Sequence, residues 1–218
     1  MSRRLPLFPL PLVAFPGELI PLHIFEPRYR QLLADCLEGD ERFGITTQAE
    51  PRPGALGTLV LIRGSQPLPD GRSNIVVEGV RRFAVRAVVP EGLPYLVAMV
   101  EEFGDGIESA PLPAELEALR TLGAEYREAL GLLADSPGDP PAWAPDPEAL
   151  SFQVAALAEV DVAAKERLLA LRSTRERARA LLDLLPPLVQ AARARATVHV
   201  RARSNGKGHH GHDIVTGG

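Results

Sequence analysis

The stretch LPLFPLPLVAFPGELIPLHIFEPRYRQLLADCLEGDERFGI, residues 5–45, combines prolines, large apolar residues and one helical pattern. In its second half, five apolar or small residues recur at the spacing of one helix face. Pro27 suits the first helical position and Gly39 suits the position that follows the last turn. The pattern predicts an amphipathic helix that covers a core. Its apolar stripe consists of Tyr29, Leu32, Leu33, Cys36 and Leu37.

The segments that follow this helix have the signature of β-strands. They are rich in β-branched or aromatic residues and are separated by clusters of glycine and proline. Asp-Gly within residues 69–72 predicts a tight hairpin turn, and Gly79 inside an apolar run predicts a bulge or a bend. Short, frequently interrupted strands are typical of a small closed or nearly closed antiparallel barrel. The expected strands cover residues 58–63, 74–79, 82–89 and 95–103.

The second half of the chain has the apolar spacing of helices. Asp146-Pro147 marks the start of one helix, and Asp161 caps a short one after it. Ser173 and Glu176 have the spacing of a capping box at the start of a last helix. We therefore expect several helices after the β-rich half.

Together these patterns predict an α+β fold. Pro186-Pro187 is expected to break or sharply kink the last helix, because proline lacks the N–H that a helix interior needs. The C-terminal segment has little apolar surface to bury and is expected to be disordered. The predicted organisation is a β-barrel with one inserted helix in residues 1–110, a helical bundle in 111–200 and a disordered tail in 201–218.

Composition indicates a soluble globular protein, with 45% apolar and 24% charged residues. Cys36 is the single cysteine, so no internal disulfide is possible, which fits a reducing cytoplasm. The apolar N-terminus is interrupted by prolines, unlike a signal peptide. No run of about 18 apolar residues, the length of a transmembrane helix, occurs. We predict a cytoplasmic protein without a membrane partner.

The net charge of −4 is unevenly distributed. Residues 91–161 contain 15 acidic and two basic residues, whereas residues 162–203 contain three acidic and ten basic ones. Such asymmetry can mark a surface for nucleic acid or for an acidic partner. The alternative, which we favour, is that the acidic and basic helices face one another or water.

The sequence contains no recognisable catalytic or cofactor motif. Glycine-rich phosphate loops and serine nucleophile motifs do not occur. Cys36 lies on the apolar stripe of its helix, where a thiol is usually a small buried hydrophobe. Three histidines lie close together near the C-terminus. They could bind a metal loosely, but an incidental cluster is the interpretation that we favour. We therefore predict no enzymatic activity, no cofactor and no metal site. The three histidines are His209, His210 and His212.

The charged run Glu26, Arg28 and Arg30 lies at the start of the predicted helix. A negative charge is favourable at a helix N-terminus. We expect Arg28 and Arg30 to bridge to acidic residues on strands and to hold the helix on the barrel. Direct contact with a ligand is the second interpretation.

Three separated stretches resemble the N-terminal, substrate-binding domain of the ATP-dependent protease Lon. Within residues 5–45 the resemblance rests on LPLFPL, FPG, PLHIFEPRY and FGI, in that order. Residues 68–85 resemble the family's second motif, which ends in an Arg-Phe pair, and residues 151–185 resemble its helical part. The resemblance implies a PUA-like β-barrel followed by a helical bundle, although Pro186-Pro187 departs from the family pattern.

What the resemblance implies about function is binding rather than catalysis. The ATPase and protease modules of Lon have no counterpart here, so the chain is similar to standalone members of the family. The resemblance implies a module that binds unfolded or exposed polypeptide segments, with a protease or chaperone as a plausible partner. The alternative is RNA binding, which PUA-like barrels host elsewhere, through Arg193, Arg195, Arg201 and Arg203. The acidic overall charge makes nucleic acid the weaker expectation.

The N-terminal segment carries more large apolar residues than one short strand easily buries. One interpretation is that they fill the barrel. The other is that part of them forms an exposed interaction site, or that an extended segment adds to a barrel edge as a strand. The candidate peptide-binding residues are Phe15, Pro16, Leu19, Leu22, His23, Phe25 and Arg28.

Overall fold

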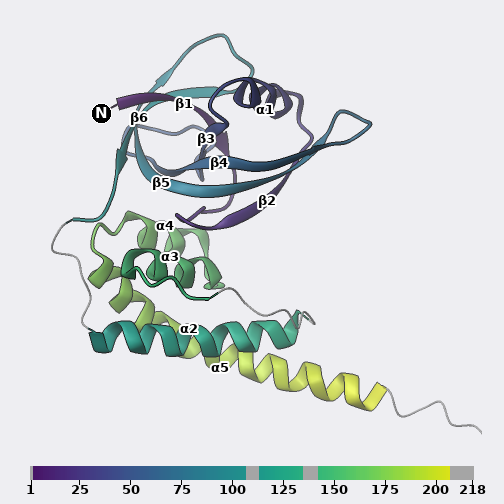
Figure 1. Ribbon diagram of the computed structural model, residues 1–218, viewed down its shortest axis with the longest axis vertical. Coiled ribbons are helices and arrows are strands. Elements are labelled where there is room, and N and C mark those ends of the chain that lie inside the picture. The colour runs from purple at the N-terminus through teal and green to yellow at the C-terminus, as the bar shows by residue number, and fades with distance from the viewer. Residues whose placement is uncertain (1, 107–112, 135–141, 207–218) are drawn as a thin grey trace, which may run out of the picture.

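The computed structural model describes residues 2–106, 113–134 and 142–206. Their strands form a barrel with helix α1 (Pro27–Glu38) beside it, and helices α2 to α5 form a separate layer that lies below the barrel in Figure 1. The predicted α+β class, with the β-barrel before the helices, is therefore confirmed.

Five strands close the barrel in the cyclic order β5-β4-β3-β1-β6-β5. All neighbours are antiparallel except β1 and β3, which are parallel. The parallel pair was not predicted, and it arises because the chain returns through α1, a crossover that parallel strands require. The five strands are β1 (Ser2–Pro9), β3 (Arg42–Thr46), β4 (Leu56–Pro67), β5 (Ser73–Val89) and β6 (Leu96–Phe103).

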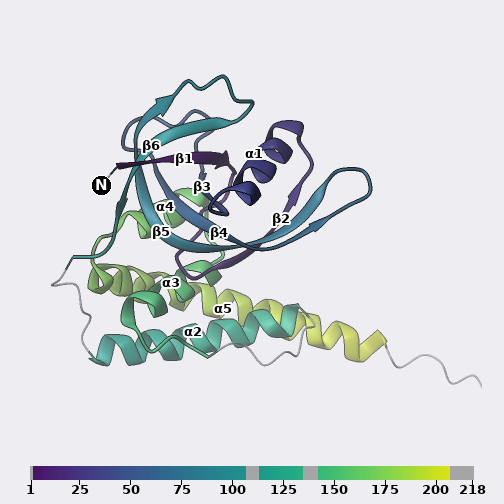
Figure 2. The ribbon, with the colours of Figure 1, turned by 45° about the horizontal axis from the view of Figure 1, so that its top comes forward.

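The sixth strand, β2 (Leu19–Ile24), lies outside the closed ring, and among the described residues it pairs with β5 alone. It can do so because β4 and β5 are long and continue beyond the barrel as a hairpin, seen at the right of Figure 2. The hairpin turns at the predicted place. Gly71 has φ +80°, and the Leu68 N–H donates to the Arg72 carbonyl at 2.8 Å.

Gly79 marks the predicted irregularity in β5. It pairs with Val60 and the next paired residue is Arg81, so Val80 forms a bulge. A side chain at position 79 has no room, because a Cβ there would lie 2.0 Å from the Phe15 carbonyl oxygen. The Gly79 N–H donates to the Glu18 carbonyl at 2.9 Å. The turn before β2 therefore packs directly on the backbone of β5.

Helix α1 closes the hairpin side of the barrel with its apolar stripe. Tyr29, Leu32, Leu33 and Cys36 are buried against strand residues such as Phe8. Leu37, the last residue of the predicted stripe, remains 43% exposed. Pro27 occupies the first turn and Gly39 caps the end, as predicted.

The helical layer consists of α2 (Pro113–Leu133), α3 (Pro147–Leu157), α4 (Val162–Ala170) and α5 (Thr174–Gly206). The predicted starts are confirmed by their caps. The Asp146 and Asp161 carboxylates accept from the N–H groups of Ala149 and Ala164, at 2.8 and 2.6 Å. The Ser173 hydroxyl accepts from the Glu176 N–H at 3.3 Å.

Helix α5 corrects one prediction. It runs without a break through Pro186 and Pro187 and ends at Gly206. Both prolines face solvent, and the helix is held on either side of them by Leu185 and Val189, which are buried in the core shared with α2 and α3. The helix thus continues into the segment predicted to be disordered, whose remaining residues, 207–218, lie outside the described residues.

Candidate functional site

The candidate site lies at the end of the barrel where β2, the β4–β5 hairpin and α1 come together (Figures 1 and 2). Along β2 the side chains alternate, as expected for a strand with one buried face. Ile20 and Ile24 are buried, whereas Leu19, Pro21 and His23 are exposed. The candidate residues on β2 are therefore divided between the core and the solvent by strand geometry.

Several large apolar side chains remain in solvent here. Leu19 is 62% exposed and Phe25, just after β2, is 58% exposed. Val76 of β5, directly opposite Pro21, is 40% exposed. We call these four residues together with His23 the β2 surface. Several exposed apolar groups of this size along one strand are typical of an interaction site.

His23 is fixed on this surface by two neighbours. Its Nδ1 lies 2.7 Å from the Asn74 Oδ1, the side chain of the residue paired with it across the strands. Its ring is stacked on that of Phe25 with the centroids 6.1 Å apart. The imidazole therefore orients the exposed Phe25 ring.

A trough of about 460 Å³ lies beside β2 on the outer face of the strands β2, β5 and β4. Its floor is formed by the backbone of the hairpin, where Gly64 pairs with Val76. Pro21 and Val76 supply apolar walls, and His23 supplies a polar end. The residues that line it include Pro21, Leu22, His23, Gly64, Asn74 and Val76.

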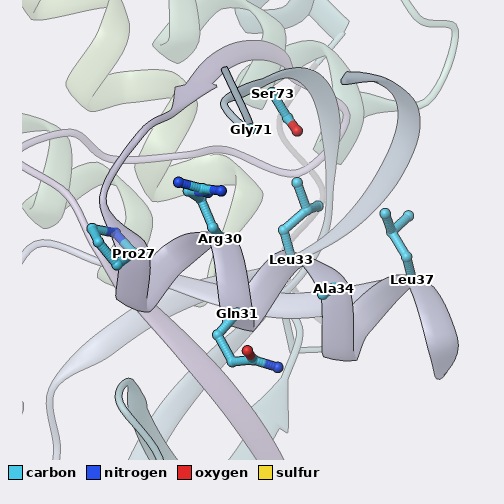
Figure 3. A pocket seen from close by; sticks show the side chains of 8 residues that line it. All are labelled: Pro27, Arg30, Gln31, Leu33, Ala34, Leu37, Gly71 and Ser73. Atoms are coloured by element: carbon cyan, nitrogen blue, oxygen red, sulfur yellow. The ribbon is translucent and has the colours of Figure 1, made fainter. Parts of the chain in front are cut away.

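A second hollow, of about 530 Å³, separates α1 from the turn of the hairpin. Figure 3 shows Arg30, Leu33 and Leu37 pointing from the helix toward Gly71 and Ser73. The Arg30 guanidinium lies against the turn, since a Cβ on Gly71 would be 2.2 Å from its Nη2. This hollow extends the site from the β2 surface to the far side of the hairpin.

The charges around the site are mostly paired locally. Arg28 pairs with Glu26 at 2.8 Å, Arg72 with Asp70 at 2.6 Å, and Arg63 with Glu78 at 2.5 Å. Hydrogen bonds from Arg72 hold the pKa of Asp70 below its ordinary value. The charges of these three pairs therefore compensate each other.

The prediction that Arg28 and Arg30 bridge to acidic strands is wrong. Arg28 pairs with Glu26, its neighbour in sequence, and its guanidinium lies 4.5 Å from the centre of the Tyr29 ring. Arg30 reaches the hairpin turn and forms no ion pair within the described part of the chain. The helix is held by its apolar stripe and not by these charges.

The other predicted peptide-binding residues lie elsewhere. Phe15 is completely buried in the core between the barrel and the helices, where it packs against Phe152, so it is not accessible to a peptide. Pro16 is half-buried and lines a hollow next to Phe103 and Phe152. The structure thus brings Leu19, Leu22, His23, Phe25 and Arg28 to one end of the barrel and separates Phe15 and Pro16 from them.

Two exposed apolar residues of the site were missed by the sequence reasoning. Val76 belongs to a segment that was identified as a strand, and its outward phase follows from the burial of Ile75 and Val77 on either side. The alternation of side chains along this strand could therefore have identified Val76 as exposed. Leu37 was assigned to the buried stripe because its spacing fits, but it lies at the end of α1, beyond the edge of the core.

The single cysteine and the metal-binding side chains of the described residues do not form a metal site. Cys36 is buried as predicted, its thiol donates to the Arg42 carbonyl at 3.3 Å, and burial raises its pKa to about 12. No group of three or more metal-binding side chains comes together in residues 2–106, 113–134 and 142–206. The histidines at 209, 210 and 212 lie outside these ranges.

Three basic residues of α5 face acidic partners, in agreement with the favoured interpretation of the charge asymmetry. Arg179 pairs with Glu115 at 2.7 Å. Arg193 pairs with Glu125 at 3.1 Å, and Arg195 with Glu159 at 2.8 Å. These side chains are engaged within the protein. In the ranges that the structure describes, no helix has both the length and the hydropathy needed to cross a membrane.

Residues 4–186 match the family described as the ATP-dependent protease La (LON) substrate-binding domain. The Lon protease of Solibacter usitatus is 32% identical over 136 residues, which cover 57% of this chain and 17% of that protein. Lon protease 2 of Myxococcus xanthus is 30% identical over 83% of this chain and 23% of its own length. The chain spans about a fifth of the length of these curated relatives.

Two solved structures have the same fold. The Lon N-terminal domain protein from Xanthomonas campestris is 27% identical, with a TM-score of 0.65 over 84% of this chain and 99% of that one. The N-terminal domain of the Mycobacterium avium complex Lon protease is 19% identical, with a TM-score of 0.62 over 84% of this chain and 98% of that one. At 19% identity, the second structure is evidence for a shared fold alone.

Proposed function

This chain belongs to the Lon substrate-binding domain family, and we propose that it is a non-enzymatic module that binds polypeptide segments through the β2 surface. The family is named for binding a substrate and not for cleaving one. A module of this kind recruits unfolded or partner proteins, and a protease or chaperone in the cytoplasm is the partner we propose for it.

One observation carries the proposal. Leu19, Phe25 and Val76 expose large apolar groups along β2 and its partner strand, although the same strands bury Ile20, Ile24 and Ile75. Exposure of a Leu or Phe side chain forgoes roughly 1.5–3 kcal/mol of burial. A partner that covers this surface recovers part of that free energy. Leu22, His23 and Arg28 complete the proposed contact surface, and Phe15 and Pro16 do not belong to it.

The test is a fluorescence anisotropy titration with a labelled, permanently unfolded polypeptide at low and high salt. We expect saturable binding that changes less than about twofold with salt, because apolar contacts are screened little by ions. The double variant Leu19→Ser/Phe25→Ser should weaken binding by about tenfold or more, since it removes two buried apolar contacts. Leu132→Ser is the matched control, because Leu132 is 51% exposed on α2, in the helical layer.

A labelled single-stranded RNA in the same titration tests the alternative. Binding to RNA that collapses with salt is the behaviour expected of phosphate contacts, and it would refute the proposal if the polypeptide failed to bind. Equal loss of polypeptide binding in Leu132→Ser and in the double variant would also refute it. That result would mean that the β2 surface has no special role.

A further inference from the structure

Strand β2 has a free edge. Its one partner in the sheet is β5, with Pro21 opposite Val76 and His23 opposite Asn74. Strand β6 pairs with a different part of β5, residues 82–89, and with β1. An edge strand exposes a row of backbone N–H and C=O groups that can template a further strand.

The structure indicates which backbone groups face this edge. In an antiparallel pair, residues alternate between those bonded to the partner and those directed away from it. The Gly79 N–H donates to the Glu18 carbonyl, so even-numbered residues from Glu18 onward are bonded to β5. The position of Pro21 is consistent with this alternation, because odd-numbered residues direct their backbone groups away from β5. A proline within a strand is tolerated where its missing N–H would face solvent.

The open edge therefore presents the backbone N–H and C=O groups of Leu19 and His23 and the C=O group of Pro21. Within the described part of the chain, no backbone hydrogen bond outside the ladder with β5 reaches these groups. All three residues are exposed. The loss of one donor at Pro21 limits indiscriminate pairing but leaves two donors and three acceptors available.

The surroundings of the edge determine what kind of segment fits. An added strand lies on the side of β2 away from β5, where its alternate side chains flank the exposed side chains of Leu19, Pro21 and His23. The nearby charges are already compensated in the pairs Arg63–Glu78, Arg72–Asp70 and Arg28–Glu26. A charged side chain would find no free counter-ion in these pairs, and Arg30, which forms no ion pair in the described residues, lies against the hairpin turn at Gly71. The edge formed by Leu19, Pro21 and His23 therefore favours an uncharged segment.

From these observations we infer that β2 binds its polypeptide by strand addition. The occupant is an extended, uncharged segment with apolar residues at alternate positions, and its backbone pairs with Leu19, Pro21 and His23. This inference rests on the proposed function and specifies the class of segment that the β2 surface recognises. Backbone pairing supplies affinity without a fixed sequence, and the exposed side chains of Leu19 and Pro21 beside the edge supply the preference for apolar residues.

The test uses a fluorescein-labelled peptide whose six central residues alternate valine and threonine, to match the six residues of β2. Two derivatives carry N-methyl groups on the backbone, one at the valines and the other at the threonines. Amides of alternate residues in a strand point to the same side. One derivative should therefore bind at least about tenfold more weakly, because several backbone hydrogen bonds are lost, and the other should bind within about threefold of the parent.

The two derivatives are matched controls for each other in composition and in stiffness. Equal binding of both, whether strong or weak, would overturn strand addition, while binding of the unmethylated peptide would keep the proposed function standing. Failure of the parent peptide and of the unfolded polypeptide together would instead remove the proposed function itself.

A gain-of-function variant provides a test that misfolding cannot imitate. Pro21→Val adds the missing N–H to the open edge and should tighten binding of the parent peptide about two- to tenfold, the effect of one additional hydrogen bond. Unchanged or weaker binding by a folded Pro21→Val protein would contradict the inference. A second copy of the chain is the competing occupant. It would replace the proposal if the protein sedimented as a dimer that Leu19→Pro, which removes an edge N–H, converted to a monomer.

Discussion

Arg82 of β5 and Arg177 of α5 share one buried carboxylate, that of Asp105. The Arg177 Nη2 lies 2.7 Å from the Asp105 Oδ2, and the Thr174 hydroxyl donates to the same oxygen at 2.5 Å. Arg82 also donates to the carbonyls of Leu169 and Leu171. A strand of the barrel and two helical segments are thus tied together at one point, which fixes the barrel that carries the β2 surface on the helical layer.

Asp105→Asn is expected to destabilise the fold by about 3–5 kcal/mol at neutral pH, because it removes the buried carboxylate that two buried guanidinium groups share and leaves only the more distant Glu148, 3.7 Å from Arg82, as a counter-charge. Urea unfolding monitored by circular dichroism measures this difference. Glu78→Gln, which removes the exposed pair with Arg63, is the control and should cost less than about 1 kcal/mol. Similar losses in the two variants would mean that the buried cluster contributes no more than a surface pair.

The same variant has a defined pH dependence. Burial acts to raise the pKa of Asp105, but hydrogen bonds from Arg177 and Thr174 and the charges of both arginines lower it overall. A carboxylate with a depressed folded pKa stabilises the fold above its unfolded pKa of about 4, and this stabilisation is lost as the pH falls through the folded value. The difference between the wild type and Asp105→Asn should therefore shrink in acid. A difference that grew would contradict this assignment.

Glu18 should make the folding stability depend on pH in the opposite direction. Burial raises its pKa, although the Phe15 N–H and Lys165 act to lower it. A raised folded pKa means that stability falls as the pH rises from the unfolded value of about 4.3 through the folded one. Glu18→Gln cannot ionise and keeps an oxygen for the Phe15 N–H, so its stability relative to the wild type should increase with pH across this window. Urea titrations at several pH values check this, and a flat or falling difference would rule it out.

Much of the fold is predictable from local sequence. The helix α1 stripe, the caps Asp146 and Asp161 and the hairpin turn at Gly71 each depend on residues close in the chain, and each was found where expected. The buried cluster of Arg82, Asp105 and Arg177 was not predicted, because it joins residues far apart in the sequence. Spacing alone cannot show which arginine among many is desolvated by a remote carboxylate.

The candidate site was predictable only in part for the same reason. The apolar excess of the N-terminal segment is visible in the sequence, but its division into buried Phe15 and exposed Leu19 depends on where the turn before β2 meets Gly79. Val76 joins the site through the pairing of β2 with the hairpin. Strand pairing between distant segments is set by the tertiary fold, so the surface became visible only in three dimensions.

Gly79→Ala should destabilise the protein by about 1–3 kcal/mol or more, the usual cost of overpacking. Its Cβ would lie 2.0 Å from the Phe15 carbonyl oxygen, a backbone atom that cannot rotate away. Gly64→Ala is the matched control on the neighbouring strand, because a Cβ there meets no atom within 4 Å, and we expect a change of less than about 1 kcal/mol. Thermal unfolding of both variants tests the prediction, which fails if Gly79→Ala is as stable as Gly64→Ala.

Pro187→Ala should stabilise the protein, because α5 continues through this position although proline supplies no N–H for the Asp183 carbonyl one turn earlier. Proline costs about 3 kcal/mol relative to alanine inside a helix, and the greater freedom of the unfolded alanine chain offsets about 0.4–1 kcal/mol of the gain. Since Pro187 is exposed, no packing is lost, and urea unfolding should show a gain of about 2 kcal/mol.

Pro147→Ala is the matched control for this last variant. Pro147 occupies the first turn of α3, where its missing N–H costs nothing and its fixed φ is favourable. The control should therefore give no gain or a small loss. If Pro187→Ala instead destabilised the protein, the bond to Asp183 would not form, and α5 would have to be locally distorted at the two prolines, with its C-terminal part held by the packing of Val189 and Ala192 in the core.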